Sequence, residues 1–84
     1  MQKDEIKALI SAGIPDCQVE VMGDDGTHFE AVIVSDAFKR MNMVQRHQLV
    51  YQSLGGKMGG EIHALSMQTY TMEEWQQKSQ LRVI

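Results

Sequence analysis

The sequence predicts an α/β protein whose elements follow in the order α-β-β-α-β-α. Three observations predict this class: a short helical repeat at the start, two apolar segments on either side of a glycine-rich turn, and a longer helical segment before a third apolar segment. A strand joined to a later strand through a helix is almost always a right-handed parallel crossover. We therefore expect a three-stranded mixed sheet with strand 2 in the centre, packed against helices.

The first helix is predicted over residues 2–12. Ile6 and Ile10 recur at helical spacing, and the run Gly13-Ile14-Pro15 supplies a stop. From residue 16 the period changes to two, because Cys17 and its alternate neighbours are apolar while the residues between them are mostly polar. This alternation predicts a strand with one buried face, in which Cys17 is a small buried hydrophobic residue.

Residues 23–26, Gly-Asp-Asp-Gly, predict the turn of a β-hairpin, and residues 29–34 predict its returning strand. Residues 35–38 can open a short helical turn. Asn42 with Gln45 then has the spacing of a capping box for the second helix. The apolar side of that helix is expected to carry Val44, His47, Val50, Tyr51 and Leu54, with a packing role for His47.

Glycines 55 and 56 end the second helix, and residues 62–70 predict the third strand. Thr71 with Glu74 repeats the capping-box spacing, so a last helix is expected over residues 72–79. Parallel strands start at the same edge of a sheet. We therefore expect His28, before the second strand, to lie beside His63, at the beginning of the third.

The length and composition limit the class of protein. Eighty-four residues predict a single domain over residues 1–84, and a formal charge of -3 disfavours the phosphate backbone of nucleic acids as a partner. Cys17 is the only cysteine, which excludes an internal disulfide and fits a reducing cytoplasm. The sequence has no apolar stretch long enough for a membrane span and no nucleophile elbow or Walker loop, so we expect neither membrane association nor enzymatic activity.

Four segments together resemble the BolA-like proteins, and most closely their short bacterial IbaG-type branch. They cover nearly the whole chain in the family's order: Thr27-His28-Phe29, residues 45–51 (Gln-Arg-His-Gln-Leu-Val-Tyr), residues 62–66 (Ile-His-Ala-Leu-Ser) and residues 71–75. The resemblance implies a class II KH-like fold, in agreement with the predicted element order. It also implies a monothiol glutaredoxin with a Cys-Gly-Phe-Ser site as partner, and a shared [2Fe-2S] cluster in iron-sulfur trafficking or in iron and stress regulation.

His63 matches the family histidine that ligates the bridging cluster. The family's second ligand comes from the loop between the first two strands, where this sequence offers His28, with Asp25 as the alternative. The residues agree with a shared site, because a [2Fe-2S] cluster needs four ligands, commonly thiolates, and histidine can replace cysteine on one iron. One cysteine and three histidines cannot supply the usual thiolates. The sulfur ligands would come from a glutaredoxin and its glutathione, so the isolated chain is expected to be a cofactor-free monomer.

A nucleic-acid-binding regulator that uses the KH-like surface is the alternative function. Lys39, Arg40 and Arg46 would form its basic patch around the second helix. The run Gly56-Lys57-Met58-Gly59 fits the GxxG pattern of KH domains, but it falls between a helix and a strand, so we interpret it as a connecting loop. Docking to glutaredoxin without a cluster is a third hypothesis for the function.

Overall fold

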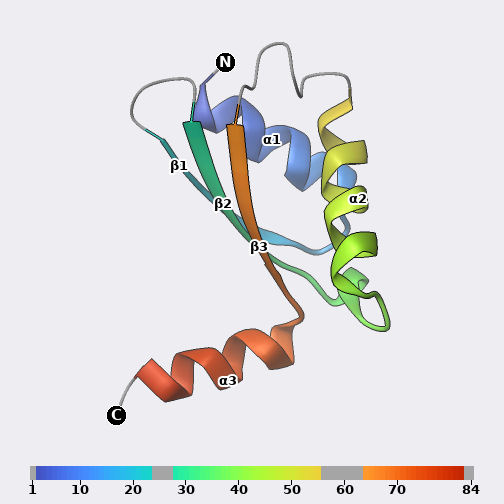
Figure 1. Cartoon of the computed structure of the whole chain (residues 1–84), viewed down its shortest axis with the longest axis vertical. Coiled ribbons are helices and arrows are strands. Elements are labelled where there is room, and N and C mark those ends of the chain that lie inside the picture. Colours follow the sequence, from blue (N-terminus) through green and yellow to red (C-terminus); the bar gives the residue numbers. More distant parts are fainter. Residues whose placement is uncertain (1, 24–27, 56–63, 83–84) are drawn as a thin grey trace.

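The computed structural model describes residues 2–23, 28–55 and 64–82, and these residues adopt the predicted order of helices and strands (Figure 1). The elements are α1 (Lys3–Gly13), β1 (Gln18–Met22), β2 (His28–Val34), the 3-10 turn η1 (Asp36–Phe38), α2 (Met43–Leu54), β3 (Ala64–Tyr70) and α3 (Met72–Arg82).

The strands form one mixed sheet in the order β1-β2-β3. β1 and β2 are antiparallel, with Gln18 opposite Val34, whereas β2 and β3 are parallel, with His28 opposite Ala64. The central position of strand 2 and the parallel crossover are thus confirmed. β3 is described from Ala64 onward, and residues 62–63 of the predicted strand lie outside the described residues.

One face of the sheet is covered by α1 and α2. Ile6 and Ile10 of α1 and Val50 and Leu54 of α2 are buried against alternate residues of β1 and β2, which are Val19, Val21, Phe29, Ala31 and Ile33. Each of these side chains except that of Ala31 stabilises the fold by about 1.5–3 kcal/mol relative to an exposed one. The opposite face of the sheet, the outer face, carries the remaining strand residues, and none of the described helices lies along it (Figure 1).

The buried side of α2 differs from the predicted one. Val50 and Leu54 are buried as expected, but Val44 and Tyr51 are exposed, at 65% and 41%. Arg46 is buried in their place, because its guanidinium finds hydrogen-bond partners inside the fold. The buried row of α2 therefore runs 46-50-54, a spacing of one helical turn that apolar periodicity alone does not reveal.

Both predicted capping boxes are present. The Gln45 backbone N–H donates to Asn42 Oδ1 at 2.8 Å, and the Asn42 N–H donates to Gln45 Oε1 at 3.0 Å. At α3, the Thr71 N–H donates to Glu74 Oε1 at 2.8 Å and the Glu74 N–H to Thr71 Oγ1 at 3.2 Å. These reciprocal bonds fix where each helix begins.

α3 lies at the far end of the strands, away from α1 and α2 (Figure 1). It extends to Arg82, beyond the predicted end at residue 79. Its first turn is attached through the Met72 N–H, which donates to Asp36 Oδ1 at 3.1 Å, and through the ring of Trp75, 5.4 Å from that of Tyr70. None of the described helices has the length and hydropathy that crossing a membrane requires.

The helices α1 and α2 approach closely at Gly13. A Cβ atom at this position would lie 2.5 Å from Ser53 Cβ and 2.9 Å from Ser53 Cα, which is too close for two carbon atoms. Glycine is therefore needed here for its small size, and it allows the backbones of the two helices to meet.

We predict that Gly13→Ala lowers the free energy of unfolding by about 1–3 kcal/mol, because the added methyl group forces the helices apart. Urea denaturation followed by circular dichroism measures this change. Ser11→Ala, on the exposed side of the same helix, is the control and should stay within about 0.5 kcal/mol of the wild type. Equal stability of Gly13→Ala and the wild type would contradict the close helix contact.

Candidate functional site

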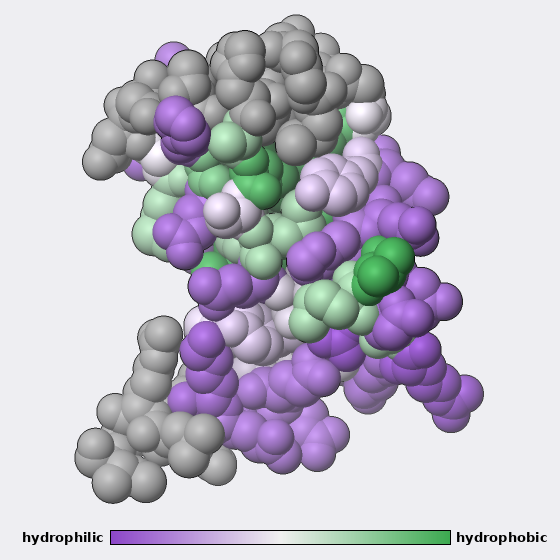
Figure 2. Space-filling view, viewed as in Figure 1, coloured by the Kyte–Doolittle hydropathy of each residue, from purple (hydrophilic) through white to green (hydrophobic). Residues whose placement is uncertain are grey.

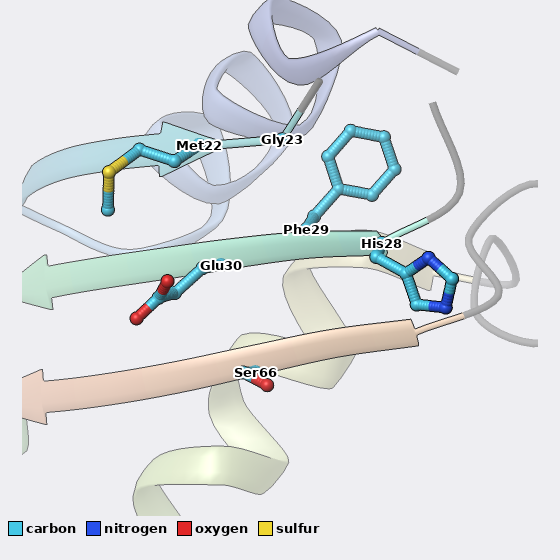
Figure 3. Close-up of a pocket in the computed structure, with 6 residues that line it drawn as sticks. All are labelled: Met22, Gly23, His28, Phe29, Glu30 and Ser66. Carbon is cyan, nitrogen blue, oxygen red and sulfur yellow. The ribbon is translucent and has the colours of Figure 1, made fainter. Parts of the chain in front are cut away.

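The candidate site is an open pocket of about 290 Å³ at the edge of the sheet where β2 begins (Figure 3). It is lined by Met22, Gly23, His28, Phe29, Glu30 and Ser66. His28 is the first residue of β2 and is exposed. In Figure 3 its imidazole extends away from the Glu30 carboxylate, beside the start of β3.

Strand alternation and register bring these residues together. His28 and Glu30 are two residues apart on β2, so both side chains project from the outer face, while Phe29 between them is buried in the core. The register places Met22 of β1 and Ser66 of β3 on either side of Glu30. An imidazole, a carboxylate, a hydroxyl and a thioether therefore share one end of the outer face.

Gly23 allows β1 to end beside this pocket. A Cβ atom on Gly23 would lie 2.6 Å from the His28 carbonyl oxygen and 2.8 Å from Cδ1 of the Phe29 ring. The absence of a side chain thus lets the two strands of the hairpin stay close at the position of His28.

Among the predicted ligands, His28 is the one whose position is described. His63 and Asp25 lie outside the described residues, as does the run from Gly56 to Gly59. Within the described ranges, no three His, Cys, Asp or Glu side chains gather closely enough to hold a metal ion. The described part of the pocket therefore offers His28 as an imidazole donor with Glu30 as a neighbouring carboxylate.

Cys17 and His47 do not line the pocket, and Cys17 precedes β1, which begins at Gln18, instead of lying within that strand as predicted. Cys17 is half-buried against the core, and its Sγ is 3.9 Å from the Ile10 carbonyl oxygen. His47 is half-buried on α2, and its Nε2 is buried without a hydrogen-bond partner among the described residues.

The three cations predicted to form a basic patch have different environments. Lys39 is exposed and lies 3.7 Å from Asp36 Oδ2. Arg40 is exposed in the left-handed backbone region, with a φ of 65°, in the turn before α2. Arg46 is buried, so it is not available as a surface contact.

Arg46 instead joins four parts of the chain. Its Nε donates to the Met41 carbonyl oxygen at 3.2 Å, and Nη1 donates to the Thr69 carbonyl oxygen at 3.4 Å. Its two terminal nitrogens bind the Glu74 carboxylate at 2.7 and 3.2 Å, and its guanidinium lies 5.8 Å from the centre of the Phe38 ring. A buried guanidinium is tolerated only when it is paired in this way.

The pKa of Glu74 is lowered from its ordinary value, chiefly by the hydrogen bond from Arg46 and then by the backbone N–H of Thr71. A carboxyl group with a lower pKa in the folded state stabilises the fold at pH values above its ordinary pKa. This contribution is lost as the pH falls through the lowered value.

We predict that Glu74→Gln reduces stability at pH 7 by about 1 kcal/mol or less, since the Glu74 side chain is 45% exposed and water screens the pair. The difference from the wild type should shrink as the pH falls below 4.5, the ordinary pKa of the carboxyl group. Urea midpoints measured from pH 7 to pH 3 test this. Glu73→Gln, the exposed neighbour, should show no such convergence, and a pH-independent difference for Glu74→Gln would refute the assignment.

Sequence reasoning missed Met22, Glu30 and Ser66 as neighbours of His28. The signal for Glu30 was present, because residues two apart on a strand share a face. Ser66 and Met22 required the register of β3 and β1, which the sequence did not specify. Glu74 was recognised as a cap but not as the partner of Arg46.

Comparison with known proteins identifies relatives of the chain. Residues 14–74 match the family model described as BolA-like protein. The DNA-binding transcriptional regulator BolA of Vibrio cholerae is 44% identical over 54 residues, which are 64% of this chain and 51% of that protein. Human BolA-like protein 1 is 42% identical over 55 residues, 66% of this chain and 40% of that protein. The matched segments thus span about half or less of these relatives.

The fold also matches a solved structure. A BolA protein homologue from Coxiella burnetii superimposes with a TM-score of 0.81 and 40% sequence identity, covering 90% of this chain and 97% of the other. The superposition thus covers more of the chain than residues 14–74, which the family model matches.

Proposed function

The chain belongs to the BolA-like family, and we propose that it is a non-enzymatic adaptor that binds a monothiol glutaredoxin and shares a [2Fe-2S] cluster with it. The cluster is the cargo of the pair, in iron-sulfur trafficking or in iron and stress regulation. The observation that carries the proposal is the exposed imidazole of His28, which lies where the two parallel strands begin, on the rim of an open pocket.

The ligand count supports a shared cluster. A [2Fe-2S] cluster takes four ligands, and this chain has one cysteine, Cys17, which is half-buried against the core. We assign His63 as the principal ligand from this chain and His28 as the second, with Asp25 as the alternative to His28. The glutaredoxin and its glutathione would supply the sulfur ligands.

The adaptor function predicts a coloured heterodimer when the chain is mixed anaerobically with a Cys-Gly-Phe-Ser glutaredoxin, glutathione, iron and sulfide. His63→Ala should abolish the visible cluster absorption of the chromatographically isolated heterodimer, because an imidazole ligand is lost. His28→Ala should shift or weaken the spectrum if His28 is the second ligand, and Asp25→Ala should do so if Asp25 is.

His47→Gln is the control, since it removes the third histidine from a position outside the pocket, and its heterodimer should keep the wild-type spectrum. Far-UV circular dichroism verifies that each variant folds. A full cluster spectrum in His63→Ala would reject that ligand. A colourless but stable heterodimer of the wild type would instead indicate docking without a cluster, and the absence of any heterodimer would reject the adaptor.

DNA binding is the second candidate, because one relative is named as a DNA-binding transcriptional regulator. Lys39 and Arg40 are the exposed cations that the structure leaves for it, whereas Arg46 is buried. The formal charge of -3 opposes strong attraction to phosphates.

If the protein binds DNA through this turn, its affinity should fall steeply between 50 and 200 mM salt, a range in which phosphate contacts are screened, and Arg40→Ala should weaken binding further. Fluorescence anisotropy with labelled duplex DNA measures both effects. Lys3→Ala, an exposed cation on α1, is the control and should leave the affinity unchanged. Equal losses for the two variants would argue against a defined DNA site.

A further inference from the structure

We propose that the outer face of the sheet is the docking surface for the glutaredoxin, the partner that supplies the sulfur ligands. The glutaredoxin would present to this face an apolar centre surrounded by basic side chains. This inference rests on the proposed function, because it assigns the place where that partner binds. The residues of this docking surface come from β1, β2 and the first turn of α3.

The centre of this surface is a groove of about 320 Å³ lined by Gln18, Glu20, Met22, Val32, Val34 and Trp75. Val32 and Val34 line it from the central strand, and Trp75 from α3. Trp75 is fixed there by its ring contact with Tyr70 and by the capped start of α3. The apolar groove is therefore held open by the fold itself.

The groove continues into the pocket that contains His28. Met22 lines both. Glu30 of the pocket is followed two residues later, on the same face of β2, by Val32 of the groove. A partner that places a ligand beside His28 consequently extends over the groove as well. This continuity distinguishes the outer face from the exposed Val44 and Tyr51 of α2, which project from a helix on the other side of the sheet.

The apolar side chains of this face have the character of an interface. Met22 is 51% exposed at the end of β1, and methionine and tryptophan are enriched where proteins associate. Figure 2 shows apolar side chains over the upper part of the strands, where β2 and β3 begin, and mostly hydrophilic ones toward α3. Val34 is already buried, so a partner would remove apolar surface from water chiefly at Met22, Val32 and Trp75, which favours association.

The charges on the face select the kind of partner. Glu20 and Glu30 are both exposed on the outer face, on neighbouring strands. Lys7 approaches Glu20 only to 3.9 Å with both side chains well exposed, so this pair is weak. Within the described residues, no ion pair involves Glu30. The cation Lys78 lies over the Tyr70 ring, on the β3 half of the outer face. Basic side chains of a partner would complement the β1–β2 half.

The test measures the dissociation constant of the apo-heterodimer with the Cys-Gly-Phe-Ser glutaredoxin and glutathione by isothermal titration calorimetry. Met22→Lys and Glu30→Lys should each weaken binding tenfold or more, because each puts a cation where the partner is basic. Met43→Lys is the control for the first: Met43 is 56% exposed on α2, and the charge change is the same. Asp4→Lys on α1 is the control for the second. Both controls should bind within twofold of the wild type.

The outcomes separate this inference from the function on which it rests. If the wild type forms no heterodimer with glutaredoxin either in this titration or in the anaerobic assembly with iron and sulfide, the proposed function fails. If it forms the cluster-bridged heterodimer but shows no binding in this titration, the docking surface is rejected while the function stands. If the wild type binds and Met22→Lys and Glu30→Lys bind equally well, or if the controls weaken binding as much, the docking surface is rejected while the function stands. Thermal unfolding verifies that the variants fold, and Glu20→Lys, on the neighbouring strand, replaces any variant that does not; unchanged binding of Glu20→Lys also rejects the surface.

Discussion

The parallel pairing of β2 with β3 is the constraint on which the candidate site depends. It aligns the starts of two strands that are far apart in the sequence, so that His28 lies opposite Ala64 and Glu30 opposite Ser66. The antiparallel hairpin adds Met22 from the other side. Because side chains alternate along each strand, the same register that buries Phe29, Ala31 and Ile33 under the helices directs their neighbours to the outer face. A shift of one residue would exchange the core and the site.

Arg46 links this sheet to the last helix. Its guanidinium reaches the end of β3 at Thr69 and the first turn of α3 at Glu74, while its backbone belongs to α2. Lysine could not replace it, because a single ammonium group cannot bind a carboxylate in the same two-pronged way while also reaching two carbonyl oxygens. The position of Trp75, and with it the end of the apolar groove, follows from this contact.

Much of the fold could be predicted from the sequence because its local signals agree. Asn42 with Gln45 marked the start of α2, and Thr71 with Glu74 marked the start of α3. The crossover rule predicted the strand order. The buried side of α2 could not be predicted, because a hydropathy pattern treats arginine as a surface residue, and the partners that allow Arg46 to be buried are 23 and 28 residues away. The surroundings of His28 were missed for a related reason: Ser66 joins them only through strand register. Whether His63 joins His28 stays a prediction, since residue 63 lies outside the described part of the chain.

The contact between Gly13 and Ser53 also has a consequence for motion. Two helices whose backbones touch cannot slide along each other without a clash, so α1 and α2 should move with the sheet as a single rigid unit. α3 is attached at its first turn, through Asp36, Arg46 and Tyr70, and again at Lys78, whose Nζ donates to the Tyr70 hydroxyl at 2.6 Å. Any rearrangement on association should therefore be concentrated at Thr71, between this unit and α3, and it would leave the core undisturbed.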